Sequence, residues 1–141
     1  MEPCPLSPDA WSAVFPVALA SVEEARLALQ DFLRGSDIAE RVLNRIEVVL
    51  EEVVSNVVRH GHGADRITLQ AECTGGALHL TVGDNGPAFD PLATAEPAPF
   101  TTLGEATIGG QGIPLIKRLT QSAHYARDGA FNRLDLAFAL A

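Results

Sequence analysis

Hydrophobic residues recur at helical spacing in two neighbouring segments of the chain. The first segment contains Val22, Ala25, Leu29, Phe32 and Leu33. Ser21 and Glu24 match a capping box, which predicts that this helix begins at Ser21. Gly35 predicts its end, because glycine commonly follows the last turn of a helix.

A second helix is predicted from Ile38 to His60. Its apolar residues again fall at intervals of three and four and form one stripe: Val42, Leu43, Ile46, Val49, Leu50, Val53 and Val57. The sequence Gly61-His62-Gly63 predicts the end of the helix. This is the longest element that the pattern indicates.

The pattern changes to strict alternation after Arg66, as in a half-buried strand. The alternating apolar residues are Ile67, Leu69, Ala71 and Cys73, then Leu78, Leu80 and Val82. Gly75-Gly76 lies between the two runs and predicts a hairpin. Trp11–Val17 is a further candidate strand, and Pro16 indicates either that this strand lies at an edge of the sheet or that it ends there.

The C-terminal part of the chain predicts a short helix and a closing hairpin. Ile113, Leu115, Ile116 and Leu119 suggest the helix, and the Asp128-Gly129 turn separates the last two strands. Before them, Pro87–Gly110 has no clear period, and a segment of this kind in a small domain is usually either a lid or disordered; we expect a lid over Leu92–Ile108. We therefore expect a tail over residues 1–10 and one domain over 11–141. Its fold class is α+β, with a mixed β-sheet covered by helices on one face.

Charge and the N-terminus limit the classes of function. The chain has 10 Lys and Arg against 18 Asp and Glu, and its formal net charge is -8. Such a surface repels phosphate backbones, so we expect no nucleic-acid partner. No segment approaches the roughly 20 apolar residues of a membrane span. The N-terminus lacks the features of a signal peptide, and we expect a cytoplasmic protein without a membrane partner.

Three groups of residues could carry chemistry. Glu52 and Asn56 are four residues apart, so they lie on one face of the second helix, one turn from each other. A carboxylate there could deprotonate a hydroxyl group, and an amide oxygen is a suitable Mg²⁺ ligand. Taken alone, this pair is better explained as part of a solvated helix face.

The second group is Asp84, which strand parity places on the same face as the buried residues Leu80 and Val82. A buried carboxylate requires hydrogen-bond donors, and the exocyclic amine of adenine could be one. A local turn over Asp84–Pro87 explains the residue equally well. The third group is Gly109-Gly110-Gln111-Gly112, which precedes a helix and could admit phosphate oxygens to backbone N–H groups. Taken alone, such a glycine cluster is equally typical of a flexible turn.

The order of these groups resembles the GHKL ATPase superfamily. The matching segments are Glu52–Asn56 followed by His60-Gly61, then Asp84–Pro91, then Gly109–Ile113. More narrowly, the chain resembles the small bacterial anti-sigma-factor serine kinases. This resemblance implies the ATP-binding fold known as the Bergerat fold, with ATP or ADP and Mg²⁺ as cofactors.

The resemblance also implies roles for individual residues. Glu52 would be the catalytic carboxylate, Asn56 would ligate Mg²⁺, and Asp84 would accept a hydrogen bond from adenine. The other residues of the nucleotide site would be Gly86, Thr101, Gly110, Gly112 and Ile113. The chain would phosphorylate a STAS-type anti-anti-sigma protein, bind a sigma factor and form a homodimer.

Two features depart from the family pattern. Ala88 replaces a glycine that many relatives have, and Leu92–Gln111 contains no Lys or Arg. Because phosphoryl transfer develops negative charge, Arg59, Lys117 or Arg118 would have to supply the missing cation. Two alternatives therefore remain. The chain could be a nucleotide-gated binding module without transfer activity, or a detached histidine-kinase catalytic domain, although few residues precede the fold.

Overall fold

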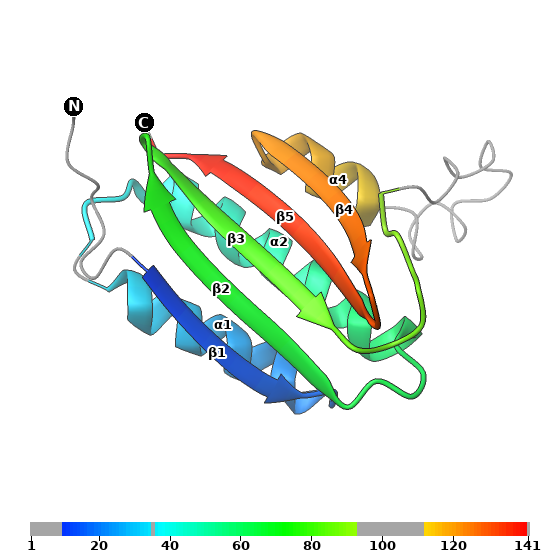
Figure 1. Ribbon diagram of the computed structural model, residues 1–141. Coiled ribbons are helices and arrows are strands. Elements are labelled where there is room, and N and C mark those ends of the chain that lie inside the picture. Colours follow the sequence, from blue (N-terminus) through cyan, green and yellow to red (C-terminus); the bar gives the residue numbers. More distant parts are fainter. Residues whose placement is uncertain (1–9, 35, 93–111, 141) are drawn as a thin grey trace, which may run out of the picture.

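In the part of the chain that the structure describes, five strands form one sheet and three helices cover one of its faces (Figure 1). The computed structural model describes residues 10–34, 36–92 and 112–140. The elements in chain order are β1 (Ala10–Pro16), α1 (Ala20–Leu33), α2 (Glu40–His60), β2 (Arg66–Thr74), β3 (Ala77–Asp84), α4 (Gly112–Leu119), β4 (Ser122–Asp128) and β5 (Phe131–Ala139). The α+β class and the one-sided helical layer are confirmed.

The sheet is antiparallel throughout and not mixed as predicted. Its strand order is β1-β2-β3-β5-β4, and each neighbouring pair is antiparallel. Two helices connect β1 to β2, so the chain has reversed direction when it enters β2. The crossover through α4 makes β4 parallel to β3, but β5 lies between these two strands. No parallel strands are therefore neighbours in the described sheet.

Both predicted hairpins are confirmed. Gly75 and Gly76 connect β2 to β3, and their φ angles of 59° and 76° are those of a type I′ turn. The hairpin pairs Ile67 with Asp84, which fixes where β3 ends relative to β2. Gly129 has a φ of 63° and begins the turn between β4 and β5.

The first helix begins differently from the sequence prediction. Leu19 is its N-cap residue, and no side chain caps the helix. Ser21 is buried, and its hydroxyl donates a hydrogen bond to the Pro16 carbonyl at 2.5 Å. The capping-box prediction is wrong because the Ser21 side chain instead joins the helix to the end of β1.

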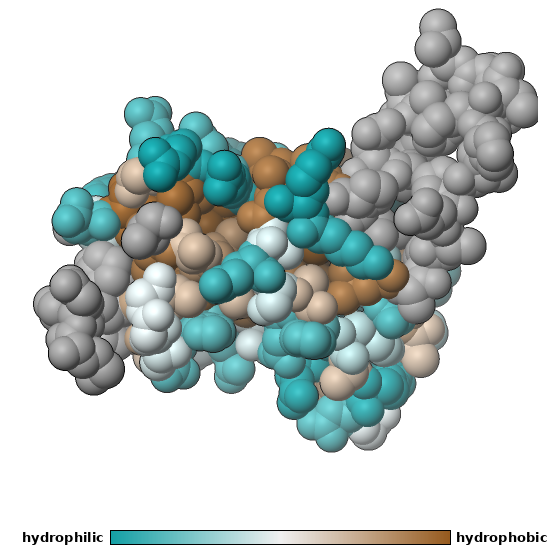
Figure 2. All heavy atoms as spheres, turned by 90° about the horizontal axis from the view of Figure 1, so that it is seen from above, coloured by the Kyte–Doolittle hydropathy of each residue, from teal (hydrophilic) through white to brown (hydrophobic). Residues whose placement is uncertain are grey.

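The core lies between the sheet and the helices. The apolar stripe of α2 contributes Val42, Ile46, Val49, Leu50 and Val53, all buried. On the outer side of this layer, Arg26 of α1 binds Glu47 of α2 at 2.9 Å. Figure 2 shows the molecule from above, with hydrophobic surface lying beside hydrophilic side chains.

Part of the predicted lid cannot be compared with the structure, because residues 93–111 lie outside the described ranges. The tail over residues 1–9 also lies outside them. Among the described residues, no helix has the length and hydropathy required to cross a membrane.

Candidate functional site

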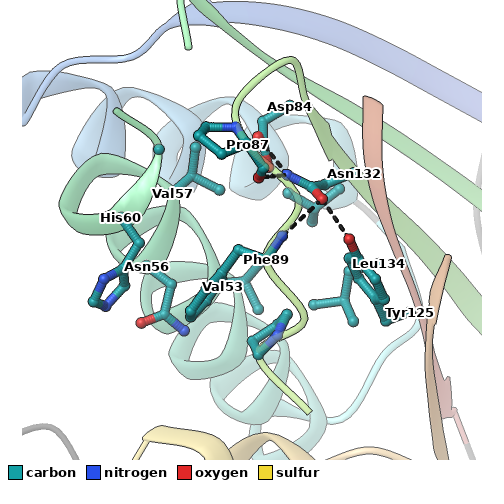
Figure 3. Close-up of a pocket in the computed structure, with 13 residues that line it drawn as sticks. Val53, Asn56, Val57, His60, Asp84, Pro87, Phe89, Tyr125, Asn132 and Leu134 are labelled. Atoms are coloured by element: carbon teal, nitrogen blue, oxygen red, sulfur yellow. Dashed lines mark hydrogen bonds between the residues drawn. The ribbon is translucent and has the colours of Figure 1, made fainter. Parts of the chain in front are cut away.

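A pocket lies between the C-terminal half of α2 and the sheet, where β3 ends and β5 begins (Figure 3). Its lining residues are Val53, Asn56, Val57, His60, Gly61, Val82, Asp84, Pro87, Phe89, Pro91, Tyr125, Asn132 and Leu134. Two of the predicted site residues, Asn56 and Asp84, thus face the same pocket from different layers of the fold.

Asp84 is buried at the end of β3, as strand parity predicted. Its Oδ1 atom accepts hydrogen bonds from the Gly86 backbone N–H at 2.8 Å and from Asn132 Nδ2 at 3.0 Å. The first of these bonds belongs to the local turn over Asp84–Pro87, so Asp84 also has the role in the turn that the sequence offered as the alternative. Oδ2 accepts no hydrogen bond from the described residues, and Asp84 is one of the residues that line the pocket.

Asn132 connects most of the groups around Asp84. It lies directly opposite Asp84 in the β3–β5 pair, and its side chain is buried. Nδ2 also donates to the Pro87 carbonyl at 2.8 Å, and Oδ1 accepts from Tyr125 Oη at 2.5 Å and from the Phe89 N–H at 3.1 Å. Asn132 thereby holds the loop after β3 in place.

Asn132 was not among the residues that the sequence singled out. It shares strand parity with the inward residues Leu134, Leu136 and Phe138 of β5. The same signal that identified Asp84, a polar residue on the buried face of a strand, was therefore present. Arg127 adds to this network, because its Nη1 donates to the Gly86 carbonyl at 2.8 Å.

Gly86 lies where two backbone segments approach each other. A Cβ atom there would be 3.0 Å from Asp84 Oδ1, 3.1 Å from Ala64 Cβ and 3.3 Å from Gly61 Cα. The turn after β3 and the loop after α2 could not pack this closely around a larger residue. The close contacts that Gly86 permits in this structure are therefore contacts with other atoms of the protein.

Arg59 connects the two predicted residues of α2. Its Nη2 donates to Asn56 Oδ1 at 2.6 Å and to Glu52 Oε1 at 3.2 Å. Asn56 is buried, whereas the Glu52 side chain is 25% exposed. One guanidinium group thus contacts both the amide oxygen and the carboxylate that the sequence proposed for metal binding and catalysis.

Glu51, the residue directly before Glu52, points away from this row. Its carboxylate lies 3.5 Å from Arg26 of α1, and its side chain is 47% exposed. The neighbouring Glu52 faces Arg59 instead. The phase of the helix therefore distinguishes the two adjacent glutamates.

The pocket is nearly filled by the loop after β3. Phe89 stacks on His60 of α2 with ring centroids 4.8 Å apart (Figure 3). The free space is about 30 Å³, which is room for a water molecule or two but too little for a purine base.

The remaining predicted residues belong to the segment before α4 and to its first turn. Thr101 and Gly110 lie outside the described residues, while Gly112 and Ile113 begin α4. Arg118 lies in the last turn of α4 and lines a hollow with Arg41 and Arg45 near the start of α2. Arg45 is 11 residues before Asn56, a distance of roughly 16 Å along the helix. Arg118 is therefore remote from the pocket, and Arg59 is the described cation beside Asn56.

A family comparison agrees with this geometry. The model of the family described as histidine kinase-like ATPase domain matches residues 15–138. Serine/threonine-protein kinase BtrW of Bordetella bronchiseptica is 32% identical over 90 residues, which are 61% of this chain and 63% of the relative. An anti-sigma F factor of Geobacillus stearothermophilus is 28% identical over 96 residues, 66% of each chain. The chain spans slightly less than two thirds of the length of these relatives.

Solved structures share the fold at low sequence identity. The structure of the RsbU and RsbW domains of a Mycobacterium tuberculosis protein has a TM-score of 0.69 at 16% identity, covering 93% of this chain and 32% of that one. The catalytic domain of histidine kinase ThkA has a TM-score of 0.54 at 15% identity, with 92% and 96% covered. At these identities the similarity concerns the fold.

Proposed function

The chain belongs to the histidine kinase-like ATPase domain family, and on this basis we propose that it is an anti-sigma-factor serine kinase that uses ATP with Mg²⁺. The observation that carries the proposal is the position of Asp84 and Asn56 on opposite walls of one pocket. The names of the relatives, a serine/threonine-protein kinase and an anti-sigma F factor, support the same activity.

Asp84 is suited to recognise adenine. Its Oδ1 is engaged by Gly86 and Asn132, which fixes the orientation of the carboxylate and leaves Oδ2 as the acceptor for a ligand. The exocyclic amine of adenine donates to such an oxygen, whereas guanine presents an acceptor at the corresponding position. The apolar walls formed by Val53, Val57 and Leu134 would contact the faces of the base.

Asn56 and Glu52 fit a metal-dependent transfer. Asn56 Oδ1 is a hard oxygen ligand at the edge of the pocket, as Mg²⁺ prefers. When bound, Mg²⁺ supplies positive charge against the phosphate oxygens. Glu52 lies one turn earlier on α2, where its carboxylate would orient the serine hydroxyl of the partner and accept its proton.

Arg59 would supply the cation that Leu92–Gln111 lacks. In the present structure it is bonded to Asn56 and Glu52. Release of these bonds would free Asn56 for the metal and Glu52 for the hydroxyl group. The 51% exposed side chain of Arg59 could then turn toward the transferring phosphoryl group.

The partner is proposed to be a STAS-type anti-anti-sigma protein, with a sigma factor as the second partner. Incubation with radiolabelled ATP, Mg²⁺ and such a STAS-type protein tests the assignment directly. We expect one label on the partner, on serine. Nucleotide binding without any label on the partner would refute the kinase assignment.

A second candidate is a nucleotide-gated binding module that has no transfer activity. The absence of Lys and Arg from Leu92–Gln111 favours it. The same assay separates the two functions, because the module would bind the partner in an ATP-dependent manner and leave it unlabelled.

A further inference from the structure

Three arginines converge on a hollow remote from the pocket. Arg41 and Arg45 lie one turn apart near the start of α2, and Arg118 lies in the last turn of α4. The hollow has a volume of about 250 Å³. Its other lining residues are Val42, Leu119, Thr120, Gln121, Phe138 and Ala139. In Figure 1 the C-terminal end of α4, the start of β4 and the end of β5 meet in this region.

In the part of the chain that the structure describes, these three arginines lack the partners that the other arginines have. Within the described residues, no ion pair or hydrogen bond involves the side chain of Arg41, Arg45 or Arg118. The remaining arginines bind a carboxylate, a carbonyl or an aromatic ring: Arg26, Arg34, Arg59, Arg66, Arg127 and Arg133. Acidic residues outnumber basic ones 18 to 10, so we would expect each arginine to find a carboxylate with which to form an ion pair. Within the described ranges, the three arginines of this cluster nevertheless have no carboxylate partner.

The location of the cluster gives the fold no evident benefit. Arg41 is in the first turn of α2, where the positive end of the helix dipole disfavours a cation. The three positive charges around one hollow also repel one another. Only Arg118, in a last turn, is favoured by its helix. The three arginines are exposed and add no evident stability, so the cluster is better explained by a ligand.

We propose that this hollow is a docking site for an acidic segment of a partner protein. Guanidinium groups bind carboxylates in a planar, two-bond geometry, and three of them face one site here. Leu119 and the edge of Val42 provide apolar surface beside the charges. A nucleic acid or an anionic membrane would also meet the rest of a surface with net charge -8, whereas a short acidic segment contacts only this region.

The docking site is independent of the proposed kinase activity. It lies at the opposite end of α2 from Asn56, roughly 16 Å or more along the helix axis. A partner bound there would leave the pocket between α2 and the sheet accessible. The site could therefore hold a partner while nucleotide is bound.

The test uses a fluorescein-labelled short peptide rich in glutamate and leucine, and its glutamine analogue. Fluorescence anisotropy with the full chain should show binding of the glutamate peptide that weakens with added salt. Arg45→Glu should weaken binding about tenfold, whereas Arg34→Glu, which changes net charge equally at an exposed arginine, should change it less than about twofold.

Folding is checked separately with Arg45→Gln, which should unfold at the same temperature as the wild type or higher and still bind the peptide more weakly. Equal effects of Arg45→Glu and Arg34→Glu would overturn the proposal, because net charge alone would then explain binding. Binding of inorganic tripolyphosphate at this hollow without binding of the peptide would also overturn it, in favour of a small-anion site. Absence of peptide binding would do the same.

Discussion

Arg59 Nη2 lies 2.6 Å from Asn56 Oδ1, the oxygen through which Asn56 would bind Mg²⁺. A guanidinium group this close to Asn56 Oδ1 would repel a divalent cation bound to the same oxygen, because both are positively charged. The same Arg59 nitrogen is 3.2 Å from Glu52 Oε1, so one side chain engages both the Asn56 amide and the Glu52 carboxylate. Nucleotide binding with metal should therefore displace Arg59 from both.

Arg59→Gln tests this displacement. Removal of the cation should lower phosphoryl transfer by about 10²–10³-fold, because the developing charge would lose its counter-ion. The affinity for ADP without metal should change little. Titration calorimetry and a labelled-ATP assay measure the two quantities, with Arg34→Gln as a control far from the pocket. Normal transfer by Arg59→Gln would remove Arg59 from the mechanism.

Glu52→Gln should lower serine phosphorylation by about 10²–10⁴-fold, because the variant keeps size and hydrogen bonding but lacks the base. ATP affinity should remain near the wild-type value. Glu51→Gln is the matched control, since Glu51 faces Arg26 of α1. A normal rate for Glu52→Gln together with a slow rate for Glu51→Gln would show that Glu51, and not Glu52, is the catalytic carboxylate.

Asp84→Asn should weaken ADP binding by about 10–100-fold, since the amide would replace a charged acceptor and could turn an N–H toward the adenine amine. Titration calorimetry with and without Mg²⁺ measures the effect. Asn56→Ala should weaken ADP binding in the presence of Mg²⁺ and leave the affinity without Mg²⁺ unchanged. If the wild type binds no nucleotide at millimolar concentration, the ATP assignment itself is wrong.

Asn132→Leu should destabilise the fold by about 3 kcal/mol, because Tyr125 and the backbone groups of Pro87 and Phe89 would lose a buried partner. Urea unfolding followed by circular dichroism gives the free energy of unfolding. Thr81→Val removes a single bond to Asp135 and should cost clearly less. Similar losses for both variants would mean that the network around Asn132 is no special support of the loop.

The homodimer remains a prediction. β1 pairs with β2 and forms an edge of the described sheet, and Val14 is 65% exposed there. An edge strand has unpaired N–H and C=O groups that a second copy can bind. Light scattering should give twice the monomer mass at micromolar concentration, and a monomer mass at tens of micromolar would exclude the dimer.

The sequence by itself determined the elements and the phases of their residues. The helical period placed Glu52 and Asn56 on one face of α2 and turned Glu51 away, since these relations follow from 3.6 residues per turn. The alternation in β3 gave the inward orientation of Asp84. The order of the motifs gave the family. Each of these features depends on neighbours in the sequence.

The tertiary structure alone decided which distant residues meet. The insertion of β5 between β3 and β4 makes the sheet antiparallel and brings Asn132 opposite Asp84, 48 residues away. Packing of α2 against the sheet brings Asn56 and Asp84 to one pocket, and packing of α4 against α2 gathers Arg41, Arg45 and Arg118. Neither hydrophobic period carries this information, because a period fixes the face that an element buries and not the element it is buried against.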